Sequence, residues 1–417
     1  MADKDEFPLS HEQLTVISPH KLRDWWMRLR VPLPTRDPAR AWAAVRLAYE
    51  RHDALRLHLV DTADGRVRQR VRPSDQCREA AADSEPPILT ARDADVPSAP
   101  DPYHQVSRCA LLLGAEGVEA DLQVHHLGWD DRSAAVFARE LLVAVSGAGG
   151  GSVAPVASFR DHVRAQYRAG RRMGAAQRAF WDRVCEDAAE VRVPRGSVAS
   201  SAVVHSTTPV ALQASTVLAA AARAARVTPA AMVVAALLRS LAEATGVPDR
   251  LVYLVHHGRD DPRFFPVVGF FSRSVPLRVD TGAQRDLSAL ARSTMLLAAE
   301  AVEYSRPPFA LYRLARELGL SAAAGGALAE VTINVQVDPL RGVASSAHPF
   351  QQRGPSDSGT AMADRVPSRP GRLWFVADLA GAGRLWAEYD PARYPDDQVA
   401  AVLSRTAALL ARAAGCG

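Results

Sequence analysis

Apolar and polar residues alternate most clearly over residues 118–124, where Val, Ala, Leu and Val occupy every second position. This period of two predicts a half-buried β-strand, because successive strand residues point to opposite faces. An apolar run over residues 133–145 predicts a helix soon afterwards. The heptad at residues 125–131 reads His-His-Leu-Gly-Trp-Asp-Asp. It is therefore expected where a strand ends and a helix begins, a place where a side chain is held rigidly and still faces a ligand.

Similar patterns predict helices and strands along the rest of the chain. Helices are expected at residues 40–52, 211–225, 228–245 and 393–414, with an interrupted helical stretch at 158–188, and strands at 55–60, 67–71, 251–255 and 275–279. The helix at 228–245 is well delimited, because Thr228 fits an N-cap, Pro229 the first helical position and Gly246 the end. The glycine-rich residues 147–152 predict a flexible joint between two units, and residues 341–371 predict a long loop.

Composition predicts a globular protein with two cores. The chain has 417 residues, 48% of them hydrophobic, and a single core stops growing at roughly 250–300 residues. No run reaches the ~18 apolar residues of a membrane span, and the acidic N-terminus is unlike a signal peptide. The four cysteines are far apart and lack the spacing of a metal site. We therefore expect a cytoplasmic protein that needs no membrane.

The formal net charge of +4 is small for this length. Basic residues are interspersed with acidic ones and form no tract, which argues against nucleic-acid binding. A modest excess of positive charge suits an acidic protein partner better.

The heptad resembles the HHxxxDG signature of the condensation-domain superfamily. This superfamily includes the condensation domains of nonribosomal peptide synthetases, their free-standing relatives and chloramphenicol-acetyltransferase-like acyltransferases. Other segments resemble further family motifs in the family's order: residues 9–13 (LSxxQ), 178–182 (xxYW), 258–259 (GR) and 268–279 (GxFxNTLPLRV), and more loosely residues 333–336 and 385–389. The chain is identified as a member of this superfamily, and we expect a free-standing one.

The resemblance implies an α/β (α+β) fold. Two chloramphenicol-acetyltransferase-like lobes would form a V-shaped pseudo-dimer with a central tunnel. Residues 1–176 would form the N-terminal lobe that carries the heptad, and residues 177–417 the C-terminal lobe.

In this family the second histidine of the motif faces the tunnel, where a thioester-bound acyl group meets an amine or alcohol. The resemblance therefore implies that His126 is catalytic, and the ordinary pKa of histidine, about 6.5, suits proton transfer near neutral pH. The alternative is a histidine satisfied within the core. His125 should point to the other side of the strand and have a structural role.

The resemblance also assigns a structural role to Asp130, as the partner of an arginine in the other lobe, here Arg278. Asp131 departs from the motif, because the family has glycine at this position. The X domains of glycopeptide assembly lines, which recruit oxygenases and do not condense, also carry an aspartate there. A simpler interpretation is that Asp131 is the N-cap of the following helix.

Other residues are expected to line the tunnel or to modulate the motif: Trp129, Ser272 and Ser274. A second histidine pair, at residues 256–257, has the wrong spacing for the motif. There we expect Gly258 to allow two backbone segments to approach closely and Arg259 to be a structural ion-pair partner. We expect no metal site, because adjacent histidines on a strand diverge.

The leading hypothesis is a monomeric condensation enzyme of secondary metabolism. It would join an acyl or aminoacyl thioester, carried on the phosphopantetheine of an acyl or peptidyl carrier protein, to a small-molecule amine or alcohol. No cofactor would be bound by the chain itself. The alternatives are a non-catalytic platform that recruits a tailoring enzyme, and an acyltransferase that uses coenzyme A as donor.

Overall fold

The computed structural model describes residues 6–17, 22, 25–74, 88–91, 100–115, 117–147, 156–170, 172–186, 205–284, 286–307, 309–310, 329–337, 373–379 and 383–415. Its residues form two compact units. The first contains the described residues of Met1–Gly170 together with His257–Ser272, and the second contains Arg171–His256, Arg273–Asp338 and the C-terminal part. The division at Gly170 lies near the expected boundary at residue 176. Residues His257–Ser272, expected in the second lobe, belong to the first unit.

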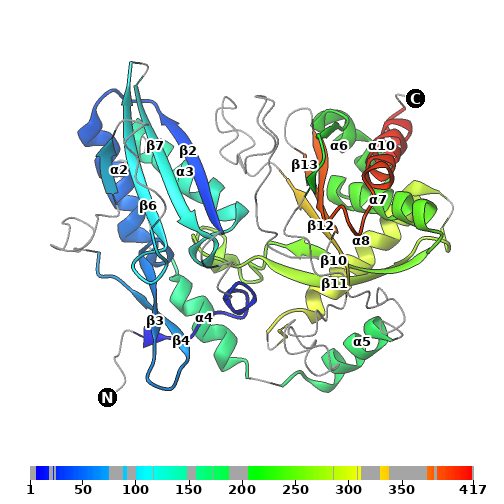
Figure 1. The fold of residues 1–417 in the computed structure, drawn as a ribbon, viewed down its shortest axis with the longest axis horizontal. Helices are drawn as coiled ribbons and strands as arrows, with labels where there is room; N and C mark the ends of the chain where they lie inside the picture. Colours follow the sequence, from blue (N-terminus) through cyan, green and yellow to red (C-terminus); the bar gives the residue numbers. More distant parts are fainter. Residues whose placement is uncertain are drawn as a thin grey trace. The chain divides into compact units, whose positions relative to one another are not determined.

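In the first unit, a four-stranded sheet is covered on one face by two helices (Figure 1). Its strand order is β2 (Trp26–Leu33), β7 (Gly117–His125), β6 (Ser107–Gly114) and β5 (Ile88–Ala91), and its helices are α2 (Pro38–Arg51) and α3 (Asp131–Ser146). The apolar residues of β7, from Val118 to Val124, face these helices and form the core with them. The period-two pattern thus correctly predicted both the strand and its buried face.

A smaller sheet and one further helix complete the first unit. The sheet has the order β1 (Glu6–Phe7), β4 (Val67–Val71) and β3 (Leu57–Asp61), and the helix is α4 (Phe159–Arg168). Leu57, Leu59 and Phe159 belong to one aromatic-rich core cluster, to which Phe270 and Phe271 also contribute. The segment His257–Ser272 therefore supplies part of the core of this unit.

The second unit is a mixed sheet with helices packed on it (Figure 1). The strand order is β11 (Arg273–Asp280), β10 (Asp249–His256), β12 (Val331–Gln336), β13 (Leu373–Asp378), β14 (Arg384–Tyr389) and β8 (His205–Ser206), with β9 (Val210–Ala211) also paired to β14. Its helices are α5 (Ala175–Cys185), α6 (Ser215–Ala224), α7 (Pro229–Thr245), α8 (Leu287–Tyr304) and α10 (Asp396–Ala413). Strand β12 runs parallel to both of its neighbours.

The predicted elements were confirmed with shifts at their ends. Helix α7 has the expected N-cap, Thr228, and ends at Gly246 in the left-handed conformation. Strand β3 begins two residues later than expected, because a 3-10 turn occupies Asp53–Arg56. The helical stretch at 158–188 is two helices, with Gly170 at φ +93° after the first. The predicted loop at 341–371 and most of the predicted joint at 147–152 lie outside the described residues.

Within the described residues, no single helix is long and apolar enough to cross a membrane. Helices α6 and α7 reach that length only as a pair, and the pair is bent by 86°.

Candidate active site

His126 lies directly after the last residue of β7 and begins a 3-10 turn, His126–Gly128. Its backbone N–H donates to the carbonyl of Trp25 at 3.0 Å. Its ring centroid lies 5.1 Å from that of Trp25 and 4.4 Å from that of Phe270. The side chain is only half-buried. The end of β7 therefore presents an imidazole that lies against two aromatic rings and is still partly accessible.

His125 is fully buried. Its Nδ1 accepts a hydrogen bond from the backbone N–H of Leu127 at 3.1 Å. Its ring meets that of Trp26 edge-on, with the centroids 5.3 Å apart. These contacts stabilise the turn that presents His126.

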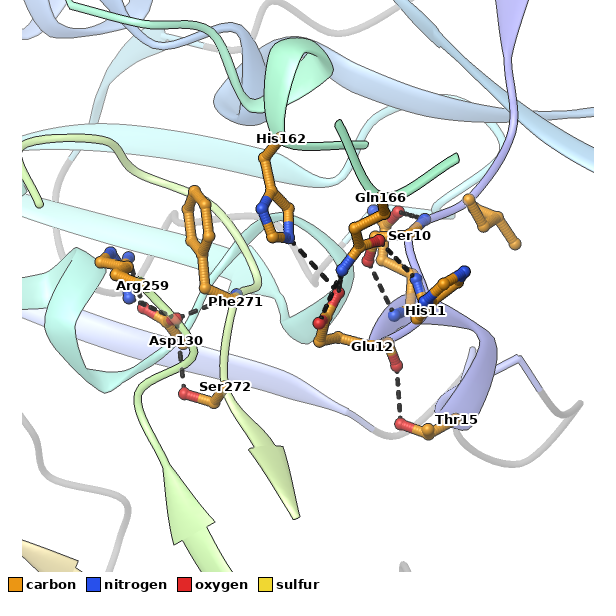
Figure 2. A network of polar contacts seen from close by, with 12 residues as sticks. Ser10, His11, Glu12, Thr15, Asp130, His162, Gln166, Arg259, Phe271 and Ser272 are labelled. Atoms are coloured by element: carbon orange, nitrogen blue, oxygen red, sulfur yellow. Dashed lines mark hydrogen bonds and ion pairs between the residues drawn. The ribbon is translucent and has the colours of Figure 1, made fainter. Parts of the chain in front are cut away.

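Asp130 is the N-cap of α3 and is buried. One carboxylate oxygen accepts from the backbone N–H of Ser133 at 2.9 Å and from its hydroxyl at 2.7 Å. The other accepts from the backbone N–H of Phe271 at 3.0 Å (Figure 2). Asp130 thus fixes the start of α3 and attaches it to the segment His257–Ser272.

Arg259 provides the charge that balances this carboxylate (Figure 2). Its Nη1 and Nη2 donate to the two oxygens of Asp130 at 2.8 and 2.9 Å. The remaining donors reach the carbonyls of Phe264, Val267 and His257 and the hydroxyl of Ser133. The guanidinium also lies 4.2 Å from the centroid of the Phe271 ring. Burial alone would raise the pKa of Asp130, but Arg259 and the hydrogen bonds of Ser133 and Phe271 keep it below its usual value.

The expected pairing of Asp130 with Arg278 was therefore wrong. On β11, Arg278 Nη2 donates to Asp249 of β10 at 2.6 Å, within the second unit. Arg259, expected to be a structural ion-pair partner, has that role. The expectation for Gly258 was also confirmed: it has φ +67°, and a Cβ atom there would lie 1.7 Å from the carbonyl oxygen of Phe271. This close approach of the two backbone segments places Arg259 within hydrogen-bonding distance of Asp130.

Asp131 is not the N-cap that we expected. The capping side chain is that of Asp130, and Asp131 is the first residue of α3, half-buried. A carboxylate in the first turn still interacts favourably with the helix dipole.

The expectation that Trp129 lines a tunnel or modulates the motif also needs correction. Trp129 is fully buried among the apolar residues of the sheet and its helices, with its ring 5.7 Å from that of Phe137. A ligand has no access to it, so its contribution is to packing. Ser272 is half-buried, and its hydroxyl donates to Asp130 at 3.4 Å. Ser274 is a half-buried residue of β11, in the second unit.

Gln13 is a residue of the site to which we assigned no role from the sequence. Its Nε2 donates to the carbonyl of Leu127 at 2.7 Å, next to His126. Its Oε1 accepts from the backbone N–H of Ser10 at 2.8 Å. The resemblance of residues 9–13 to a family motif was the available signal, and the structure gives it a meaning: Gln13 supports the turn after His126.

Glu12 forms a second buried network beside the first (Figure 2). Gln166 donates to both of its carboxylate oxygens at 2.8 Å, and Nε2 of His162 lies 3.5 Å from one of them. Burial would raise the pKa of Glu12, but His162 and Gln166 lower it to about 2. The ring of His162 in turn lies 4.5 Å from that of Phe271, so the two networks share an aromatic neighbour.

Known structures resemble this one over its whole length. SgcC5 from Streptomyces globisporus is 21% identical, with 98% of this chain and 99% of that chain covered and a TM-score of 0.70. The first condensation domain of the CDA synthetase is 21% identical, with coverage of 99% and 96% and a TM-score of 0.69. The X-domain of teicoplanin biosynthesis, solved in complex with OxyB, is 20% identical, with coverage of 100% and 94% and a TM-score of 0.66. Comparison with curated proteins finds no match.

These likenesses confirm the predicted fold class: a mixed α+β chain with two chloramphenicol-acetyltransferase-like lobes. The V-shaped arrangement and the tunnel stay predictions. The family model described as "Condensation domain" matches residues 33–365, most of the chain. The chain belongs to the condensation-domain family.

Proposed function

We propose that this protein is an acyltransferase that joins a carrier-bound acyl or aminoacyl thioester to an amine or alcohol. The observation that carries the proposal is the placement of His126. Its backbone is fixed by a hydrogen bond and its imidazole lies against two aromatic rings, yet the residue is only half-buried. Groups that transfer protons need this combination of fixed geometry and access.

The proposed reaction is attack of the acceptor on the thioester carbonyl. A C–N or C–O bond forms, the C–S bond breaks, and the leaving thiolate takes up the proton lost by the acceptor. An α-amino group has a pKa of about 7.7–8.0, so part of it is already neutral near pH 7.5. For an amine, His126 therefore orients the nucleophile and moves its proton. For an alcohol, it must act as a true general base.

A non-catalytic platform is the second candidate. The structure of a related X-domain was solved with OxyB bound. Asp131 supports this alternative, because it places a carboxylate five residues after His126, where the motif has glycine. An anion near the reacting carbonyl would oppose formation of the oxyanion.

Condensation assays with purified protein test the proposal. Acyl groups loaded on carrier proteins, and the same groups on coenzyme A, are offered with amine and alcohol acceptors. The His126→Ala and His126→Gln variants should lose product formation by at least about 100-fold, as removal of a general base typically does. The matched control is His205→Ala, which removes an exposed histidine of the second unit.

Unchanged turnover of both His126 variants would overturn the catalytic role. Inactivity of the wild type with every donor, together with binding of a tailoring enzyme, would favour the platform instead. A strong preference for coenzyme A thioesters over carrier-bound ones would reassign the donor.

A further inference from the structure

The two faces of the small sheet in the first unit differ in chemistry. Leu57 and Leu59 of β3 point into the core. Since side chains alternate along a strand, His58 and Val60 point to the other face. On β4, Arg68 and Arg70 lie on that same face, because they pair directly with Val60 and His58. We call this surface, with Arg72 just beyond the end of β4, the basic face.

Positive charge on the basic face exceeds negative charge. Arg70 pairs with Glu6 of β1, with Nη2 2.6 Å from Oε1. Arg72 is oriented by donating to the carbonyl of His104 at 3.0 Å, an acceptor without net charge. Among the described residues, three guanidinium groups thus share this face with one carboxylate, an excess of two positive charges. The acidic residues of the adjoining turns have other contacts: Asp61 accepts from the Tyr103 hydroxyl, and Asp64 pairs with Arg66.

The cationic groups of the basic face lie close to one another. Like charges side by side on a sheet are destabilising. Burial, together with the charges of Arg72, Arg70 and His104, lowers the pKa of His58 to about 4. In addition, Nε of Arg68 is buried and makes no hydrogen bond within the described residues. A buried donor without an acceptor is destabilising. A bound anion would offset the repulsion between these charges and could accept a hydrogen bond from Nε of Arg68.

We propose that the basic face is a binding site for the phosphate group of a small phosphate-bearing ligand. Guanidinium groups pair with phosphate in a planar, bidentate geometry. The charge of a phosphate monoester near neutral pH is close to −2, which matches the two positive charges left by Arg68, Arg70, Arg72 and Glu6. A carboxylate would neutralise only one of them.

Calorimetric titration of the full-length protein with inorganic phosphate tests this site. We expect saturable binding at constant ionic strength, with chloride giving no signal and acetate binding at least tenfold more weakly. The double variant Arg68→Gln/Arg72→Gln should weaken phosphate binding at least tenfold. The control Arg405→Gln removes an exposed arginine of α10, paired with Glu243, and should bind phosphate as the wild type does.

A second variant keeps the test sound if loss of arginines harms folding. Val60→Glu places a carboxylate directly opposite Arg68. It should raise the melting temperature in chloride and abolish phosphate binding. Val60→Gln, which introduces an uncharged side chain of the same size as glutamate, should do neither. His58 is a built-in reporter: in NMR titrations, phosphate should raise its pKa from about 4 toward 6.5 in the wild type and leave it unchanged in the double variant.

Three results would overturn the proposal. The first is a phosphate signal equal to that of chloride. The second is equal affinity for acetate and phosphate, which would indicate non-selective screening. The third is unchanged binding by the arginine variants. None of these outcomes depends on the acyltransferase activity, because binding is measured without donor or acceptor.

Discussion

Two arginine–aspartate pairs of this chain share their chemistry and differ in their surroundings. The side chains of Arg259 and Asp130 are 0% and 1% exposed, and each has several further hydrogen-bond partners. Those of Arg278 and Asp249 are 32% and 42% exposed. A buried pair must be complete, because a single charge left in the interior is very costly. An exposed pair is weakened by water and ions and contributes about 0–1 kcal/mol. The two pairs therefore differ in their contribution to stability because one is buried and the other is exposed, and the buried one lies at the candidate active site.

The largest expected effect comes from replacing Arg259 of the buried pair, and the same replacement of Arg278 in the exposed pair gives the comparison. Arg259→Met should lower the free energy of unfolding by about 3–5 kcal/mol, because it leaves the carboxylate of Asp130 buried without a counter-charge. Arg278→Met should cost about 1 kcal/mol or less, and less still at high salt. Urea denaturation at low and high salt measures both. Equal losses for the two variants would refute the comparison.

The buried network of Glu12 extends the comparison to pH. The folded-state pKa of Glu12 is lowered from 4.5 to about 2, so its stabilisation is complete above pH 4.5 and is lost as the pH falls toward 2. A shift of this size corresponds to roughly 3 kcal/mol. Glu12→Gln should therefore flatten the acid limb of the stability–pH curve. The exposed carboxylate of Glu243 gives the control, Glu243→Gln. A variant whose acid limb matches that of the wild type would show that other carboxylates govern acid unfolding.

Within the first unit, the smallest effect is expected at Asp131, which is adjacent to the buried pair and only half-buried itself. Because Asp131 is not the cap, Asp131→Gly leaves the capping hydrogen bonds of Asp130 intact. It should cost about 1 kcal/mol, from the lost interaction with the helix dipole and from the flexibility of glycine. Thermal denaturation measures this cost, and the condensation assay shows whether turnover changes. A gain of condensation in an otherwise inactive protein would favour the platform function.

Local patterns in the sequence predicted the individual helices and strands well. The alternation in β7, the apolar run of α3 and the end signals of α7 are properties of neighbouring residues, so no knowledge of the fold was needed. The partner of Asp130 is a different kind of question. Arg259 lies 129 residues away, and it reaches Asp130 only because Gly258 allows the backbone to approach Phe271. The resemblance to the family pointed to Arg278 as the partner, and only the structure shows that Arg259 has this role.

The same limit explains the residues that were missed or misplaced. Glu12, His162 and Gln166 come from two segments about 150 residues apart, and nothing in either segment indicates the other. Trp129 stands inside a functional motif, but motif membership does not reveal whether a side chain turns toward a ligand or into the core. Placement of the N-cap at Asp130 instead of Asp131 is a one-residue difference, within the usual uncertainty of helix ends.

The position of His257–Ser272 in the chain has a consequence for the order in which the protein is made. This segment belongs to the first unit, although residues 171–256, which precede it, belong to the second. Arg259, the partner of Asp130, is therefore synthesised only after residues 171–256 of the second unit. A fragment that stops at Gly170 would lack Arg259, Phe270 and Phe271 altogether. No single cut of the chain separates the two units. A gene that encodes only residues 1–170 would yield a first unit whose core lacks these two phenylalanines.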